Sequence, residues 1–268
     1  MKISFPPKKN KKSIEDFFIK KGLKSLVDLS KGKPYSVNEF FVPNPIMPVL
    51  DDLYNLYHYV FLNKRTTVLE FGSGWSSLIL NLALKDLKDK YFEDLKKLRR
   101  NNPFELFIVE NEKKFMKISK DRILKYNKIH KIKKPVKTKF LYTDVEMTLF
   151  NDRIATHYKK LPLCNPDFIY LDGPNQFNVK KDINGISTRH KDMMLMGCDI
   201  LKFEYFYTPG TIIVSDGRAA NIKFLRDNFK RKWKYFNDKK SDQHILWLDD
   251  TVWGRYNQLQ LNFYKNKF

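Results

Sequence analysis

Residues 68–75 of the chain read VLEFGSGW, and this stretch decides the fold. Its apolar start is typical of a short buried strand, and Glu70 places a carboxylate near the carboxyl end of that strand. Gly72 and Gly74 then let the backbone turn tightly past a ligand before a helix begins. Ser77 stands where a dinucleotide fingerprint has its third glycine or alanine, so the motif fits E-x-G-x-G instead.

Further short apolar runs follow this turn, and helical segments separate most of them. Alternating strands and helices predict an α/β fold with a doubly wound, mostly parallel sheet. The last two runs have no helix between them, so we expect a terminal antiparallel strand in a seven-stranded sheet. The expected strands are 66–71, 104–110, 138–144, 167–173, 210–217, 244–250 and 259–265. The expected helices are 75–100, a lysine-rich segment after 110, 188–206 and one that ends at Phe229.

The N-terminal part of the chain differs from this pattern. A helix is expected to begin at Ser13, in a capping-type start followed by acidic residues, and a second helix is expected after Pro48. We therefore predict a helical extension over residues 1–64 and a main domain over residues 65–268.

Composition limits the classes of protein that the chain resembles. Its 268 residues, 42% of them hydrophobic, suffice for a hydrophobic core without stabilising disulfides or metal ions. Two cysteines are too few for a disulfide framework or a four-cysteine zinc site. No apolar run has the length of a membrane span, and the start lacks a signal peptide's apolar core, so we expect a cytoplasmic protein. The net charge of +21 permits a nucleic-acid partner, although codon bias toward lysine also explains it.

A second acidic residue ends the next predicted strand. Glu110 is the residue type that accepts the hydroxyls of a ribose at this position. It follows Glu70 by 40 residues, rather than the usual ~20, because a long helix lies between them. Glu112 is close enough in sequence to compete for this role.

Together these motifs resemble the class I S-adenosylmethionine-dependent methyltransferases, over residues 65–268. The resemblance is greatest to the catechol-O-methyltransferase-like and sugar-modifying branches of that family. It implies a Rossmann-like domain with acidic or glycine-rich motifs after successive strands. The matching positions are Glu70, Gly72, Gly74, Glu110, Asp144, Asp172-Gly173-Pro174 and Asp216.

The resemblance also implies a role for each position. Glu70 and the turn Gly72-Ser73-Gly74 would hold the methionine portion of S-adenosylmethionine, Glu110 the ribose and Asp144 the adenine. These roles are expectations that come from the family alone.

The catalytic end is expected at the fourth and fifth strands. Asp172 would accept the proton of the methyl acceptor, directly or through a divalent cation such as Mg²⁺ shared with Asp216. Gly217 replaces the second acid of the family's metal pair, so a metal remains an open question. Arg218 is a candidate clamp for an anionic substrate, and His190 a candidate base.

The function expected from these residues is O-methylation of a small molecule or saccharide. Methylation of a nucleobase nitrogen is disfavoured, because Asn165-Pro166-Asp167-Phe168 precedes the fourth strand instead of ending it. Two alternatives stay open. An RNA methyltransferase would use the basic segment 111–139, and a non-catalytic binding or scaffold protein would keep the fold alone.

Overall fold

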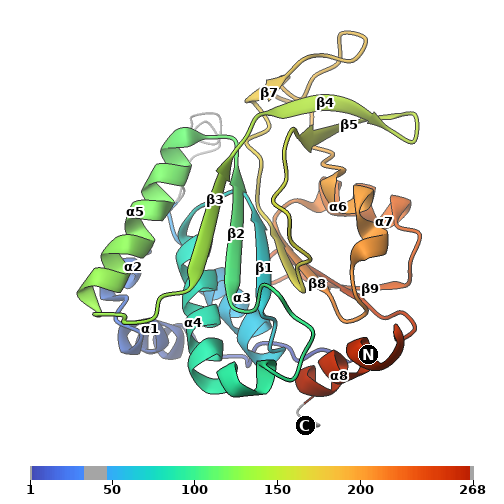
Figure 1. Cartoon of the computed structure of the whole chain (residues 1–268). Coiled ribbons are helices and arrows are strands. Elements are labelled where there is room, and N and C mark those ends of the chain that lie inside the picture. Colours follow the sequence, from blue (N-terminus) through green and yellow to red (C-terminus); the bar gives the residue numbers. More distant parts are fainter. Residues whose placement is uncertain (1, 33–46, 266–268) are drawn as a thin grey trace.

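A seven-stranded mixed sheet carries the fold in the computed structural model, which describes residues 2–32 and 47–265 (Figure 1). The strand order is β3-β2-β1-β6-β8-β10-β9, and the first five of these strands are parallel. β10 runs antiparallel to both of its neighbours. The strands are β1 (Thr67–Phe71), β2 (Glu105–Glu110), β3 (Lys137–Tyr142), β6 (Phe168–Leu171), β8 (Ile212–Asp216), β9 (Trp233–Asp238) and β10 (Gln243–Leu248).

The number of strands agrees with the prediction, but the end of the sheet was predicted wrongly. The expected strand 259–265 lies in helix α8 (Gly254–Tyr264), because Asn257, Gln260 and Leu261 form a buried helical face. The seventh strand is β9, at the edge of the sheet, whose polar, partly exposed residues give no apolar run. The antiparallel strand β10 is therefore next to the edge rather than terminal.

Helices cover both faces of the sheet. Val68 and Ile108 face a core that includes residues of α3 (Leu50–Leu62), α4 (Trp75–Leu95) and α5 (Lys113–Ile129), whereas Leu69 and Phe71 face the other side. That other side holds α6 (Asp199–Lys202) and α7 (Ala219–Asn228). Continuous apolar strands with two covered faces are characteristic of parallel sheets in α/β folds.

The predicted helix 188–206 is wrong over most of its length. Only α6 and the 3₁₀ turn η2 (Glu204–Phe206) are helical. The preceding residues form turns, in which Thr188 and Met193 bond to Gln176. These side-chain and backbone bonds hold the segment against the loop that follows β6, and they compete with helix formation.

The N-terminal helices share the core of the sheet. α1 (Lys11–Lys20) begins after Asn10, whose side chain accepts a hydrogen bond from the backbone amide of Ser13. The prediction that the helix begins at Ser13 was therefore wrong by two residues. α2 (Lys24–Leu29) follows, and α3 begins after Pro48 as expected. Phe18 and Leu26 lie in the same buried cluster as Val68.

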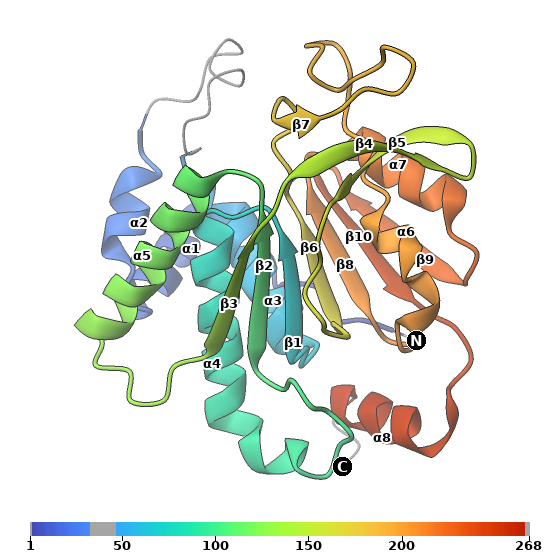
Figure 2. The same cartoon turned by 45° about the horizontal axis from the view of Figure 1, so that its top comes forward.

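A second sheet, which the sequence did not predict, lies beyond the carboxyl ends of β1–β3 (Figures 1 and 2). It consists of β4 (Val145–Phe150), β5 (Arg153–Tyr158) and β7 (Val179–Lys180). Asn151 and Asp152 turn the β4–β5 hairpin with positive φ angles. Such a pair is a known hairpin signal, and it could have revealed this element.

Within the described residues, no helix combines the length and apolar character that crossing a bilayer requires.

Candidate functional site

The carboxyl ends of the five parallel strands bring the predicted acidic residues to one edge of the main sheet. Glu70 is level with Ile108 on β2 and Tyr170 on β6. Asp172 and Asp216 follow Leu171 and Ser215, which are paired across β6 and β8. Ligands of open α/β sheets bind in the crevice outside such ends.

The two glycines of the turn after β1 serve different purposes. Gly72 has a φ of +93°, and a Cβ there would lie 2.7 Å from the backbone nitrogen of Gly173. The turns after β1 and β6 therefore pack back to back, and the glycine is required by the protein itself. A Cβ at Gly72 would therefore clash within the protein itself and not only with a ligand. A Cβ on Gly74 would meet only the Ser76 hydroxyl, at 3.7 Å.

Glu70, on β1, is fully buried beside the start of α4. Its Oε1 accepts a hydrogen bond from the Ser76 hydroxyl, and its Oε2 has no partner among the described residues. Burial raises the pKa of Glu70 to about 8, and hydrogen bonds from Ser76 and Ser77 oppose this shift. The free oxygen is available to a ligand that donates a hydrogen bond.

Glu110 is buried beside the same turn and is held by three donors. The Ser73 hydroxyl donates to its Oε2 at 2.7 Å, and the backbone amides of Asn111 and Glu112 donate to its Oε1 at 2.8 and 2.9 Å. Burial raises the pKa of Glu110 to about 7, although these bonds oppose it. A carboxylate accepts about four bonds, so one position remains.

Glu112, the competing candidate, is already engaged. Its Oε1 accepts bonds from the side-chain amides of Asn175 and Asn178, at 2.9 and 3.1 Å. Asn111 also bonds to the backbone of these two residues. This amide network joins the end of β2 to the loop after β6, and it favours Glu110 over Glu112 as the ligand-binding acid.

Asp144 lies near Glu110, immediately after β3. The backbone amide of its neighbour Thr143 donates to the Glu110 carbonyl at 3.0 Å. The carbonyl of Asp144 accepts a hydrogen bond from the backbone amide of Lys159, which follows β5, and the side chain of Asp144 is half-buried. The structure thus places Asp144 on the same edge as the other acids.

The β6–β8 half of the edge is more open. The side chain of Asp172 is 45% exposed, and a guanidinium nitrogen of Arg218, Nε, lies 4.0 Å from its Oδ1. Arg218 also donates to the Asp172 carbonyl. Surrounding protein raises the pKa of Asp172 against the effect of Arg218. Burial, followed by the charge of Asp172, raises the pKa of Asp216 to about 7.

The structure gives limited support to the remaining candidates. Within residues 2–32 and 47–265, no three acidic, histidine or cysteine side chains are arranged to hold a metal ion. His190 is exposed in the turns before α6, where its Nδ1 accepts a bond from the backbone of Asp192. His190 therefore lies in a turn and not near the start of a helix, where we had expected it, and its hydrogen bond with Asp192 is local.

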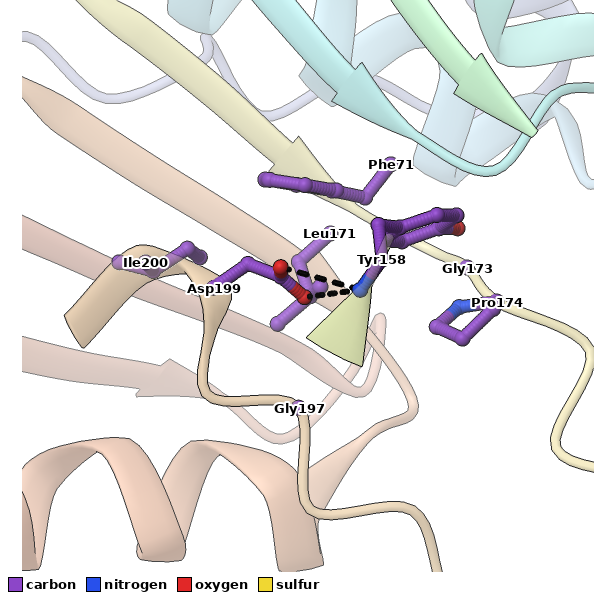
Figure 3. Close-up of a pocket in the computed structure, with 8 residues that line it drawn as sticks. All are labelled: Phe71, Tyr158, Leu171, Gly173, Pro174, Gly197, Asp199 and Ile200. Carbon is purple, nitrogen blue, oxygen red and sulfur yellow. Dashed lines mark hydrogen bonds between the residues drawn. The ribbon is translucent and has the colours of Figure 1, made fainter. Parts of the chain in front are cut away.

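Tyr158, at the end of β5, is a candidate that the sequence did not reveal. Its ring contacts Phe71 with a centroid distance of 5.5 Å, and its backbone amide donates to both carboxylate oxygens of Asp199 (Figure 3). Its hydroxyl is buried without a partner among the residues that the structure describes, and it points toward the side of Gly173 and Pro174 in Figure 3. No motif marks this residue, because only the hairpin of the second sheet brings it to the edge.

A small cavity surrounds Tyr158. It has a volume of about 220 Å³ including its open mouth. Most of this volume belongs to the open mouth, and the enclosed part has room for about one water molecule. Its lining is Phe71, Tyr158, Leu171, Gly173, Pro174, Gly197, Asp199 and Ile200.

The basic segment lies mainly on α5. The exposed lysines of this helix are Lys113, Lys114, Lys117, Lys120, Lys125 and Lys128.

Comparison with known proteins gives no further assignment, since no family model matches the chain and no curated protein matches it significantly.

Proposed function

We propose that the protein transfers a methyl group from S-adenosylmethionine to an oxygen of a small molecule or saccharide. The observation that carries this proposal is the arrangement of Glu70 and Glu110 on either side of one glycine turn. Ser73 of that turn bonds directly to Glu110, and α4 begins immediately after it. A carboxylate pair around such a turn suits the amino group and ribose of this cofactor.

The chain's own residues fit the polar parts of that cofactor. The unpartnered oxygen of Glu70 would accept a bond from an ammonium group, and the remaining acceptor position of Glu110 would bind a ribose hydroxyl. Gly74 leaves open space beside the turn, and Asp144 lies next to Glu110. When bound, the cofactor supplies an electrophilic methyl group.

The acceptor would lie at the β6–β8 half of the edge. Asp172 is accessible at the end of β6, where its carboxylate would take a proton from an acceptor hydroxyl. Arg218 donates a hydrogen bond to the backbone carbonyl of Asp172 and would hold the loop after β6 in place. The unpartnered Tyr158 hydroxyl would donate a hydrogen bond to the same ligand.

Calorimetric titration of the full chain with S-adenosylmethionine tests this proposal. We expect saturable binding at one site, whereas ATP, which shares the adenosine but lacks the methionine portion, should bind at least tenfold more weakly. Mass spectrometry of the purified protein provides a second measurement. Absence of binding at millimolar concentration would contradict the proposal and favour a scaffold role.

The exposed lysines of α5 support a second candidate, an RNA methyltransferase. Lysine–phosphate contacts give binding that falls steeply with salt and shows no sequence preference. Titration of a defined RNA and a scrambled control at about 150 mM salt separates the candidates. Selective binding of the defined RNA would favour this function over the small-molecule reaction.

A further inference from the structure

A row of polar side chains crosses three strands beside the proposed acceptor end. Gln243 on β10 is directly opposite Asp216 on β8 and Asp238 on β9. Opposed residues of antiparallel strands point to the same face, so these three side chains share one face of the sheet. The Gln243 amide donates to the Asp52 carbonyl in the first turn of α3, which places α3 on that face.

Asp242, in the turn before β10, completes a group of acidic residues. We call Asp52, Asp216, Asp238 and Asp242 the acidic cluster. Their carboxylates act on one another: burial followed by the charges of Asp216, Asp242 and other nearby acids raises the pKa of Asp52 to about 8. Among the described residues none of the four forms a salt bridge, although the chain carries a net charge of +21.

Gln243 provides an independent indication of a ligand. Its side chain is fully buried, and its Oε1 has no hydrogen-bond partner among the described residues. Leaving a buried acceptor unpaired destabilises the folded protein. The carboxylates of the cluster cannot donate to this oxygen when they are ionised, and a ligand that donates a hydrogen bond would satisfy it.

We propose that the acidic cluster, with Gln243, binds a protonated amine of the methyl acceptor. This inference rests on the proposed function and names its substrate class, an amine-bearing small molecule or amino sugar. Asp216 belongs to both the cluster and the edge that carries Asp172, so the amine would lie beside the reacting hydroxyl. A bound ammonium group would favour the ionised forms of Asp52 and Asp216, whose pKa values are raised without it, and Gln243 would supply a neutral acceptor.

An ammonium group fits this arrangement better than a metal ion does. A divalent cation requires several oxygens within about 2.0–2.6 Å, and no three acidic side chains of the described residues converge in that way. Hydrogen bonds from nitrogen to oxygen span about 2.7–3.2 Å and need less convergence. Elsewhere the positive charge of the protein repels cations, so nonspecific amine binding should be weak.

Thermal unfolding of the full chain, titrated with glucosamine, glucose or MgCl₂ at pH 7, tests the inference. We expect glucosamine to raise the melting temperature saturably, and glucose and MgCl₂ to bind at least tenfold more weakly. Asp52→Asn should weaken glucosamine binding about tenfold, and Gln243→Met should weaken it about fivefold. The control is Asp227→Asn, an exposed acid on α7 that pairs with Lys223.

The outcomes separate this inference from the proposed function. The amine subsite would be overturned if glucosamine and glucose stabilised the protein equally, or if MgCl₂ alone stabilised it. It would also be overturned if glucosamine stabilised the wild type and Asp52→Asn equally. Binding of S-adenosylmethionine, measured on the same proteins, is independent of these results. If the cofactor binds and the amine does not, only the subsite fails; if the amine binds and the cofactor does not, only the methyltransferase proposal fails.

Discussion

The two halves of the carboxyl edge differ in how they hold their acids. At β1 and β2, Glu70 and Glu110 are buried and receive hydrogen bonds from serine hydroxyls and backbone amides. At β6 and β8, Asp172 and Asp216 are more accessible and face other carboxylates and one guanidinium. The first half is therefore organised before a ligand arrives, whereas the second half is electrostatically incomplete without one.

The largest expected effect separates the two glycines of the organised half. Gly72→Ala adds a Cβ against the Gly173 backbone at a left-handed φ, so we expect a loss of about 3 kcal/mol in unfolding free energy. Gly74→Ala has open space and should cost about 1 kcal/mol or less, mainly through helix capping. Urea unfolding measures both values. Equal losses would show that the turns do not pack as described.

The next prediction concerns the incomplete half. Asp172→Asn keeps the shape of the side chain but removes its ability to accept a proton. Turnover should fall by about 10²-fold, or roughly 2.7 kcal/mol, while the affinity for S-adenosylmethionine changes less than twofold. Steady-state kinetics with a known acceptor and calorimetry measure the two quantities.

Two further results would weaken this assignment. Full activity of Asp172→Asn would exclude a proton-accepting role for Asp172, and a parallel loss of cofactor affinity would show that the halves are not independent. EDTA added to the wild type distinguishes a metal-dependent route from a metal-free one.

The sequence predicted the parallel strands of both halves better than the elements at the far end of the chain. Apolar runs ending in Glu70, Glu110 and Asp172 located parallel strands, because buried strands require continuous apolar residues. The edge strand β9 and the helix α8 escaped prediction, since their patterns are short and mixed. Local sequence thus predicted the elements whose environment is uniform.

Long-range packing decided what the sequence could not show. Gly72 needs to be glycine because of Gly173, which comes from a distant loop. Tyr158 reaches the edge on a hairpin, and Asp52 reaches it from the first turn of α3. None of these three relations follows from spacing or motif, because each depends on how separate elements meet in the fold.

A third prediction sharpens the difference in cofactor binding. Glu110→Gln retains an oxygen for the backbone amides but removes the negative charge, so affinity for S-adenosylmethionine should fall by about 1.5–3 kcal/mol. Asp121→Asn, on the exposed surface of α5, is the matched control. Calorimetry that finds unchanged affinity in Glu110→Gln would remove the ribose role from this residue.

The smallest expected effect concerns how the free energy of unfolding depends on pH. It tests whether Glu70 is shielded from water in the folded protein. The pKa of Glu70 is raised to about 8 in the folded protein, against an ordinary value of about 4.3 when unfolded. Between these values the folded state keeps a proton that the unfolded state has released. The free energy of unfolding should therefore fall as pH rises, and Glu70 should contribute about 1 kcal/mol per pH unit between pH 5 and 7.

Glu70→Gln should remove this contribution and flatten the profile measured by urea unfolding at several pH values. Glu93→Gln on α4 is the control, because Glu93 is exposed and pairs with Lys96. Its profile should run parallel to that of the wild type. If Glu70→Gln also runs parallel, Glu70 ionises as easily when folded as when unfolded, and burial does not hold a proton on it.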